Sequence, residues 1–270
     1  MLDFARPEDV DDLKALWLAC FGGPQEYVDF YYSRRFAPED TLVWRENGKP
    51  VSMMTLMRVR QGGEDGAYVY AVATLPEYQR RGLMTRLDEW SRELLKQRGA
   101  KFSSLVPAGP ELFPIYERLG YRAVYPIWVR EVRRAAKVPM EFSPCTFEEF
   151  RELRRRFLFR VPGGVLHPEP ELRYVYDELC CFSGEILRYT EKGRPCYAAC
   201  TREGGGLLIR EITGTDPVSA ARALLLRCEG EKAVIRYFKP LRGFQKVPFG
   251  MGRRLDGGDP APGYMALMLD

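Results

Sequence analysis

One stretch of the chain changes from an apolar strand to an amphipathic helix across a short basic turn, and this stretch limits the possible folds most. Residues 67–75, AYVYAVATL, are almost all apolar, and Pro76 ends the run. After the letters QRRG the chain continues as a helical pattern, and KFSSLVP at 101–107 is strand-like again. A strand, a helix and a strand in this order favour two parallel neighbouring strands in one sheet.

The remainder of the first half predicts a sheet that is otherwise antiparallel. Two strands within 41–61 are joined at Asn47-Gly48, a dipeptide typical of hairpin turns. The other predicted elements are a short edge strand at 3–7, helices at 8–21, 25–36 and 111–120, and a strand at 121–132. The predicted class is therefore α+β, with an α/β mixed sheet, mostly antiparallel, flanked by helices.

The second half repeats this order of elements without repeating the letters. Residues 133–144 carry two prolines and no clear periodicity, which favours a linker. Asp216-Pro217 is typical of a helix start, because Asp is a favoured N-cap and Pro a favoured first residue. The predicted elements are helices at 147–157, 171–179 and 217–230, strands within 184–214, and last strands at 233–238 and 264–270. The sequence therefore predicts two similar units in tandem, with domains at 1–135 and 140–270.

The composition excludes several classes of function. The 270 residues carry 41 Lys+Arg against 37 Asp+Glu, and a formal charge of +4 is too small to predict nucleic-acid binding. The start MLDFARPEDVDDLK lacks the features of a signal peptide, and no window of about 18 residues is apolar enough to span a membrane. Seven cysteines form no C-x-x-C pair and His167 is the single histidine, so we expect no metal site and a cytoplasmic location.

The basic turn before the helix predicts an anion site. The first amides of a helix have no intrahelical partner, and the helix dipole adds partial positive charge there, so a phosphate group is a natural ligand. Gly82 would let the backbone approach such a group, and Arg80 and Arg81 could add charge-assisted hydrogen bonds. The alternative is an ordinary solvated loop with basic residues.

Two segments resemble the GNAT superfamily of N-acetyltransferases. VATLPEYQRRGLM, residues 72–84, is similar to the acetyl-CoA signature Q/R-x-x-G-x-G/A after a hydrophobic strand, with Gln79 and Gly82 in place. The sequence departs from the signature at Met84, where the family has a small residue. IYERLGY, residues 115–121, is similar to the YE-x-x-G-F/Y segment that ends the GNAT core.

The resemblance covers residues 1–135 and looks most like the branch that includes the enhanced-intracellular-survival (Eis) acetyltransferases, which carry further GNAT-like units. It implies tandem GNAT-like domains, each with a mixed, mostly antiparallel sheet flanked by helices. The second half lacks the Q/R-x-x-G-x-G/A pattern. We therefore interpret it as a degenerate GNAT-like domain that binds no CoA.

The resemblance also implies a cofactor-binding set. The pantetheine arm of acetyl-CoA would lie along the strand before the turn and form main-chain hydrogen bonds with Val72, Ala73 and Thr74. The alternative for these three residues is a plain buried strand, and both roles can hold at once. The diphosphate would be held by the turn and the first helical residues, Gln79, Arg80, Arg81, Gly82, Leu83, Met84 and Thr85.

By the same resemblance Tyr116 would be the catalytic acid that protonates the departing thiolate, which suits a hydroxyl of pKa about 10. The alternative is a core tyrosine at a helix end. No general base is identified: Glu26 and Asp29 fit solvated helix faces equally well, and His167 fits a structural or surface role better. In some Eis-like proteins the terminal carboxylate serves, which here would be Asp270.

Acetyl-CoA would therefore be the cosubstrate of an N-acetyltransferase acting on a primary amine of a small molecule or peptide, by direct transfer. Trp17, Phe21, Tyr27, Phe30, Tyr31 and Tyr32 fall where this family forms its acceptor wall, although their spacing first predicts helix core. One alternative is a CoA-binding or interaction module with little catalysis. Another is an aminoacyl-transferring tandem GNAT of the cell-wall type. The acceptor and the oligomeric state stay open.

Overall fold

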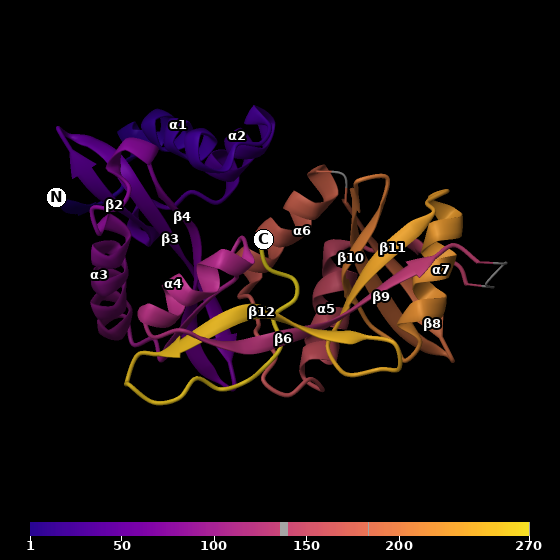
Figure 1. Ribbon diagram of the computed structural model, residues 1–270. Coiled ribbons are helices and arrows are strands. Elements are labelled where there is room, and N and C mark those ends of the chain that lie inside the picture. The colour runs from indigo at the N-terminus through magenta and orange to yellow at the C-terminus, as the bar shows by residue number, and fades with distance from the viewer. Residues whose placement is uncertain (136–139, 183, 270) are drawn as a thin grey trace. The chain divides into compact units, whose positions relative to one another are not determined.

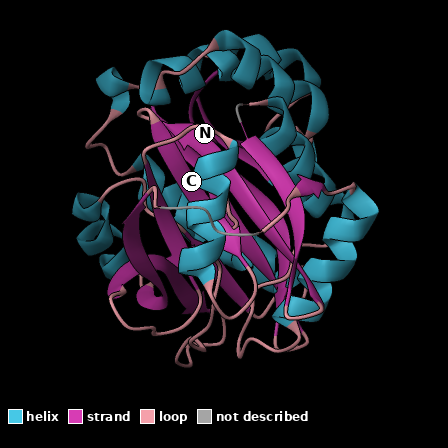
Figure 2. Ribbon diagram, turned by 90° about the vertical axis from the view of Figure 1, so that its right-hand side faces the viewer, coloured by secondary structure: helices cyan, strands magenta, loops and turns pink. Residues whose placement is uncertain are grey.

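The computed structural model describes residues 1–135, 140–182 and 184–269, and its contacts divide the chain into two compact units (Figure 1). Unit 1 consists of Met1–Arg122 and Met251–Pro260, and unit 2 consists of Ala123–Gly250 and Ala261–Asp270. Helices surround the strands of the described chain (Figure 2). Each unit therefore contains two separate segments of the sequence.

Unit 1 is a mixed sheet flanked by helices. Its helices are α1 (Val10–Phe21), α2 (Gln25–Arg34), α3 (Leu83–Gln97) and α4 (Phe113–Arg118). Its strands follow the order β1 (Leu2–Phe4), β2 (Thr41–Glu46), β3 (Lys49–Gln61), β4 (Glu64–Thr74), β5 (Phe102–Leu105) and the last residues of β12 (Gln245–Arg254). Strands β4 and β5 pair in parallel, whereas the other neighbours pair antiparallel. This is the mixed sheet that the sequence predicts.

Local sequence explains where several elements of unit 1 begin and end. Asn47 and Gly48 have φ of 50° and 82°, which suits the two central positions of a tight hairpin turn between β2 and β3. Helix α1 ends at Gly22, whose φ is 65°. Pro76 follows β4 and opens a single turn of 3-10 helix before the basic segment. The predicted hairpin and the predicted end of the first helix are confirmed.

Helices α3 and α1 pack against opposite faces of β4. Ala67 and Val69 pack in one apolar cluster with Leu87 of α3, whereas the ring of Tyr70 lies 5.8 Å from that of Trp17 in α1. Because successive side chains of a strand point to opposite faces, α3 and α1 cover opposite faces of the sheet.

Unit 2 has the same order of elements. Its helices are α5 (Phe147–Leu158), α6 (Glu169–Cys181) and α7 (Pro217–Arg227). Its strands follow the order β7 (Ser143–Pro144), β8 (Gly184–Glu191), β9 (Arg194–Glu203), β10 (Gly206–Ile212), β11 (Lys232–Tyr237) and β6 (Arg122–Arg133). Strands β10 and β11 pair in parallel, as β4 and β5 do in unit 1. The repeated element order therefore corresponds to a repeated sheet.

The sixth strand of each unit comes from the other half of the sequence. Residues 251–254 of β12 pair with 102–105 of β5, and residues 128–133 of β6 pair with β11. The expected domains at 1–135 and 140–270 are continuous segments, whereas the compact units exchange a strand. Pairing between such distant segments leaves no local pattern that a single sequence could show.

One prediction about the end of the chain is wrong, and one strand there was missed. The predicted last strand at 264–270 makes a single bridge, Gly164 with Tyr264, and it is no strand within the described residues. Its side chains from Tyr264 to Leu269 are all buried, so the apolar run reflects burial and not sheet pairing. The last strand is β12, which the sequence analysis missed. Residues 136–139 of the predicted linker lie outside the described residues.

None of the helices in the described part of the chain has the length and apolar character that a membrane span needs.

Candidate active site

Strands β4 and β5 of unit 1 separate after a short parallel pairing. They pair from Gly66 with Phe102 to Tyr68 with Ser104, and β4 then continues to Thr74. Ala71 has φ of 50°, and the register with β3 shifts at this point, which marks a β-bulge. The edge of β4 from Val69 onward is therefore not paired with β5.

The main chain of β4 distributes its hydrogen bonds between two sides. The Leu75 N–H donates to the Val51 carbonyl at 2.9 Å, and the Ser52 hydroxyl donates to the Ala73 carbonyl at 2.9 Å. Successive residues of a strand direct their main-chain groups to opposite sides, so Ala73 faces β3 and its neighbours Val72 and Thr74 face the open edge. Of the three predicted residues, the geometry therefore favours Val72 and Thr74 for a ligand along β4.

Thr74 already has two hydrogen-bond donors in this structure. Its carbonyl accepts from the Gln79 side-chain amide at 3.0 Å and from the Cys20 thiol at 3.3 Å. Burial raises the pKa of the Cys20 thiol, and the nearby Glu77 charge raises it further. Cys20 is therefore a protonated thiol that can donate. A ligand lying along β4 would meet the main chain of Val72 and the amide of Thr74.

The turn between β4 and α3 presents an uncapped helix start. Gly82 is the N-cap residue, with φ of 75° and ψ of 14°, and it supplies no side chain. Arg80 also has a left-handed conformation, with φ of 61°. No acidic residue lies in the first turn of α3. The amides of Leu83 to Thr85 therefore keep the electrostatic preference for an anion that a helix N-terminus has.

The side chains of this turn mostly hold the turn itself. The Arg81 guanidinium donates to the Glu77 carbonyl at 2.8 Å and lies 4.9 Å from the centre of the Tyr78 ring. Gln79 is bound to Thr74, as described above, and Arg80 is exposed. Main-chain amides, rather than the side chains of Gln79 and Arg81, are thus the groups available for a diphosphate.

Met84 does not fill the turn. Its side chain is half-buried and packs on the apolar cluster that contains Leu87 and Tyr116, while Leu83 is buried. Gly82 and Thr85 are exposed and line a pocket of about 880 Å³ beside α3. The departure from the small residue of the family signature is accommodated by directing the thioether into the core.

Tyr116 lies in α4 and shares one apolar cluster with Val72 and Met84. Its side chain is buried, and burial, with a smaller contribution from the Asp88 charge, raises the pKa of its hydroxyl to about 12. Its main-chain carbonyl accepts from the amides of Leu119 and Tyr121, so the turn that ends α4 holds it in place. Tyr116 is therefore a fully protonated hydroxyl at neutral pH.

An ion pair that the sequence analysis missed fixes the same region. Arg253 of β12 donates to both carboxylate oxygens of Asp88 in α3, at 2.7 and 3.1 Å. It also donates to the Leu119 carbonyl at 2.8 Å and to the Tyr121 hydroxyl at 3.2 Å. One arginine therefore links β12, α3 and the end of α4. Asp88 lies on the buried face of α3 among apolar residues. An aspartate at such a position is seldom buried without a partner, so the sequence did contain a signal for this ion pair.

The aromatic residues of α1 and α2 pack around Trp17. The centre of the Trp17 ring lies 4.8 Å from that of Tyr31 and 5.8 Å from that of Tyr70, a residue of β4 that the sequence analysis did not include. Tyr27 and Tyr70 have their hydroxyls 3.2 Å apart. Phe21 stays 46% exposed. The cluster is mainly a core, as its spacing predicts, and it contacts the strand that carries Val72.

The candidate bases are not brought together by the structure. Glu26 and Asp29 are exposed on α2, and Asp29 forms an ion pair with Lys14 at 2.7 Å. His167 is buried in unit 2, and burial together with the Arg154 charge holds its pKa well below the usual value. Asp270 lies outside the described residues.

Unit 2 has carboxylates at the position where unit 1 has an uncapped helix. The Asp216 side chain accepts from the Ser219 amide at 3.0 Å and caps α7, and Pro217 removes one donor. The Glu191 carboxylate accepts from the amides of Thr215 and Asp216 at 2.6 and 2.8 Å. The start of α7 is therefore satisfied by the protein's own acids.

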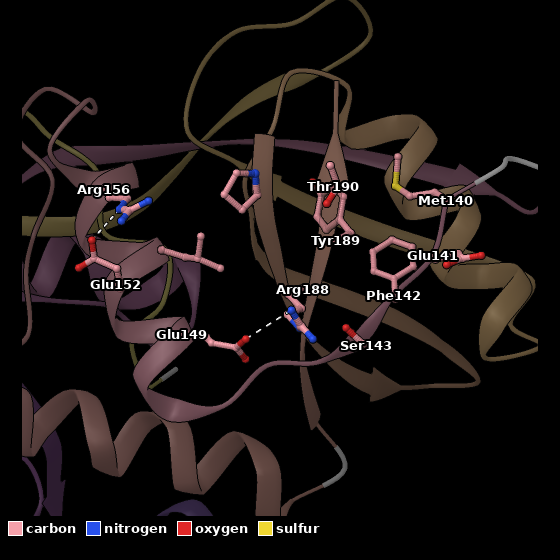
Figure 3. A pocket seen from close by; sticks show the side chains of 12 residues that line it. Met140, Glu141, Phe142, Ser143, Glu149, Glu152, Arg156, Arg188, Tyr189 and Thr190 are labelled. Carbon is pink, nitrogen blue, oxygen red and sulfur yellow. Dashed lines mark hydrogen bonds and ion pairs between the residues drawn. The ribbon is translucent and has the colours of Figure 1, made fainter. Parts of the chain in front are cut away.

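A pocket of about 580 Å³ in unit 2 lies against α5 and β8 (Figure 3). Both of its arginines are paired with a carboxylate: Arg188 lies 3.4 Å from Glu149, and Arg156 lies 2.6 Å from Glu152. Glu149 also accepts from the Thr146 amide that it caps. This pocket offers no uncompensated charge for an anion, so the candidate active site is the one in unit 1.

Known proteins share this arrangement of elements. A probable N-acyltransferase from Enterococcus faecalis has a TM-score of 0.71 at 16% identity, with 95% of this chain and 73% of that chain covered. A GCN5-related N-acetyltransferase from Kribbella flavida has a TM-score of 0.69 at 19% identity, with 95% and 72% covered. Eis1 from Mycobacterium abscessus has a TM-score of 0.68 at 14% identity, with 95% and 74% covered. These likenesses concern the fold.

The family comparison concerns the sequence. No curated protein matches the chain significantly. Residues 2–124 match the family model of the acetyltransferase (GNAT) domain, and this segment contains β4, the uncapped start of α3 and Tyr116. The matched segment covers less than half of the chain, so residues 2–124, and not the chain as a whole, are identified as a GNAT acetyltransferase domain.

Proposed function

We propose that the protein transfers the acetyl group of acetyl-CoA to a primary amine of a small molecule or peptide. The observation that carries this proposal is the difference between the two helix starts: α3 has neither a side-chain cap nor an acid in its first turn, whereas the start of α7 is occupied by Asp216 and Glu191. The open edge of β4 ends beside the uncapped helix.

The residues of unit 1 fit such a cosubstrate. The amides from Gly82 to Thr85 would hold the diphosphate, and the main chain of Val72 and the Thr74 amide would pair with the amide groups of the pantetheine arm. Both binding groups lie on one continuous segment, since Thr74 ends β4 and Gly82 precedes α3. The thioester would then lie near the cluster that contains Val72 and Tyr116.

The reaction needs one bond to form and one to break. The neutral amine attacks the acetyl carbonyl carbon, the carbon–sulfur bond breaks, and the sulfur takes a proton while the nitrogen loses one. Tyr116 is the proposed donor to the sulfur: its hydroxyl, with a pKa raised to about 12, is protonated at neutral pH and takes a proton back from solvent after each transfer. No base is assigned, so the amine proton goes to solvent or to the acceptor's own groups in this proposal.

The test is release of free thiol from acetyl-CoA in the presence of a panel of amines. Tyr116→Phe should lower the turnover number by about a hundredfold, within the usual range for general acid catalysis, and leave CoA affinity nearly unchanged. A Tyr116→Phe protein with full turnover would remove Tyr116 from the reaction.

The second candidate is a module that binds CoA and catalyses little. This candidate is favoured because the placement of the candidate bases does not suit catalysis at the unit 1 site. Glu26 and Asp29 are exposed on helix α2, and His167 belongs to unit 2. The arrangement of Met84 does not favour it, since that side chain packs into the core. Tight binding of CoA with no thiol release for any amine would support the module.

A further inference from the structure

The helix end that carries Tyr116 is held by one arginine from the last strand. Arg253 of β12 donates to the Leu119 carbonyl at 2.8 Å and to the Tyr121 hydroxyl at 3.2 Å. Leu119 and Tyr121 in turn donate their amides to the Tyr116 carbonyl, at 3.0 and 3.1 Å. Both residues that hold the main chain of Tyr116 are therefore themselves held by Arg253.

The ring of Tyr121 extends this constraint to the side chain of Tyr116. The two rings meet edge to face, with their centres 5.8 Å apart and their planes at 79°. The Arg253 guanidinium lies 4.3 Å from the centre of the Tyr121 ring, and the Ser103 hydroxyl donates to the Tyr121 hydroxyl at 3.1 Å. Tyr121 and Ser103 are both buried. The Tyr121 ring is therefore held in place, and it limits how the Tyr116 ring can turn.

Asp88 adds a negative charge to the same surroundings. Arg253 donates to both of its carboxylate oxygens, and the side chains of Arg253 and Asp88 are each 4% exposed. Burial is the main cause of the raised pKa of Tyr116, and the Asp88 charge raises that pKa further. When Tyr116 gives its proton to the sulfur, its oxygen becomes negative, which a neighbouring carboxylate opposes. By offsetting the Asp88 charge, Arg253 makes this proton transfer easier.

The four hydrogen bonds of Arg253 require a guanidinium group. Its Nη1 and Nη2 atoms donate to both oxygens of Asp88, to the Leu119 carbonyl and to the Tyr121 hydroxyl. A guanidinium presents its donors as a planar fork, whereas an ammonium group is a point charge with three donors on a flexible stem. Lysine at this position would therefore keep a positive charge beside Asp88 and lose part of the hold on the end of α4.

We propose that Arg253 is a positioning residue for acetyl transfer: it fixes the end of α4 and the Tyr121 ring, so that the Tyr116 hydroxyl keeps the orientation from which it protonates the sulfur. This inference rests on the proposed function, because it takes Tyr116 as the proton donor. Arg253 belongs to the second half of the sequence but to unit 1 of the fold. The second half of the sequence thus takes part in the reaction of unit 1.

Arg253→Lys in the full chain tests this role in turnover. We expect the turnover number for thiol release to fall about tenfold, because a small displacement of the acid is enough for such a loss. The dissociation constant of CoA should change by less than about twofold, since the amides at the start of α3 are untouched. Denaturant unfolding identifies the conditions under which the variant is fully folded, and turnover is compared there.

Fluorine NMR of 3-fluorotyrosine incorporated at position 116 tests the orientation without any reaction. The unaltered protein should give one sharp resonance, and Arg253→Lys should shift and broaden it, because the ring gains further orientations. Asp88→Asn should lower the pKa of the fluorinated hydroxyl, since it removes the charge that opposes ionisation. A role of the ion pair in stability alone would move neither quantity in the folded protein.

Arg45→Lys is the matched control. The Arg45 side chain is also 4% exposed, and it donates to both carboxylate oxygens of Asp9 at 2.7 and 2.6 Å and to the Phe4 carbonyl at 3.0 Å. These partners lie in the N-terminal segment and not at α4. Arg45→Lys should therefore cost a similar free energy of unfolding and leave the turnover number and the fluorine spectrum of the folded protein unchanged.

The outcomes separate this inference from the function beneath it. Full turnover in folded Arg253→Lys would overturn the inference and leave acetyl-CoA as the cosubstrate. A lowered turnover with an unaltered fluorine spectrum, or an equal loss of turnover in Arg45→Lys, would overturn it as well, because the effect would not come from the orientation of Tyr116. Absence of thiol release in the unaltered protein would overturn the proposed function, and the role of Arg253 in the reaction with it.

Discussion

Gly82 holds a left-handed backbone conformation at the residue that precedes α3, and no atom lies within 4 Å of the place where a Cβ would be. Gly82→Ala should cost about 1 kcal/mol of stability through backbone strain alone. In addition, the new methyl group would stand where the diphosphate approaches, so the dissociation constant of CoA should rise about tenfold. Calorimetry and denaturant unfolding measure the two effects.

Gly99 provides the matched control for this substitution. It follows the same helix at its other end, has φ of 79°, and also has open space at its Cβ position. Gly99→Ala should therefore show the same loss of stability and unchanged CoA affinity. Equal affinity losses in the two variants would mean that strain, and not the turn beside the ligand, is responsible.

The raised pKa of Tyr116 has a consequence at alkaline pH. The folded hydroxyl has a pKa of about 12, compared with a model value of 10.0, so the folded state retains the proton that the unfolded chain releases. The folded state with a protonated Tyr116 therefore keeps its full stability below pH 10, and the free energy of unfolding falls as the pH rises toward about 12. The turnover number should accordingly show no decline from loss of the Tyr116 proton between pH 8 and 10. A decline centred below pH 10 that Tyr116→Phe abolishes would contradict this assignment.

For single residues, the sequence was a better guide to which residue types the turn needs than to the hydrogen bonds that each residue forms. Gly82 was singled out because a glycine lets the backbone approach a phosphate closely, and in the structure it holds a left-handed conformation with φ of 75°. Ala73 was expected among the ligand-binding residues, yet its carbonyl is bound by Ser52, because the bulge at Ala71 sets which residues face β3. A bulge inserts one residue and so changes the facing of all that follow, and the letters alone do not show it.

Among the elements of unit 1, the end of β12 joins α3 to the end of α4 through Arg253. Its Arg253 and the Asp88 of α3 are both nearly fully buried. Arg253→Met should destabilise the protein by about 3–5 kcal/mol, because it leaves the Asp88 carboxylate buried and unpaired. Denaturant unfolding, followed by a probe in unit 1, measures the loss.

The double variant Asp88→Leu with Arg253→Met separates the ion pair from the packing. It removes both charges, so we expect it to be more stable than Arg253→Met alone. A double variant that is as unstable as the single one would show that the hydrogen bonds of Arg253 to Leu119 and Tyr121, rather than the Asp88 charge, account for the loss.

The elements that the sequence predicted are those with a strong local pattern. The amphipathic helix up to residue 98 and the Asn47-Gly48 hairpin are confirmed, since periodicity and turn chemistry are local properties. Strand β12, QKVPFGMGRR, was missed because a proline and two glycines weaken its strand pattern. The apolar run at 264–269 looked more strand-like, although its burial comes from side-chain packing.

For the whole molecule, the two helix starts predict the number of cosubstrate sites. The start of α3 has no acid, whereas Glu191 and Asp216 accept from the amides at the start of α7. Calorimetric titration should therefore give one CoA per chain, and Gly82→Ala should weaken that one site. A stoichiometry of two would show that a ligand displaces the Glu191 carboxylate.

The tandem arrangement was predictable from the order of elements, but the exchange of strands was not. The two halves share the order helix, helix, three strands, helix, strand, and this order is written along the sequence. Which strand completes each sheet depends on pairing between segments more than a hundred residues apart, such as 102–105 with 251–254. Such pairing is decided by the sheet edges that are available after folding, and it has no signature in local composition.

Because of the strand exchange, the sheet of unit 1 can be completed only late in translation. The β5 edge of the first half has left the ribosome long before residues 251–254 are made, and at about 5–20 residues per second the delay is on the order of ten seconds. During that interval the edge of β5 in the nascent chain is unpaired, and the Asp88 carboxylate lacks its partner, the Arg253 guanidinium. Translation that stops early would release an acetyltransferase segment that cannot close its own sheet.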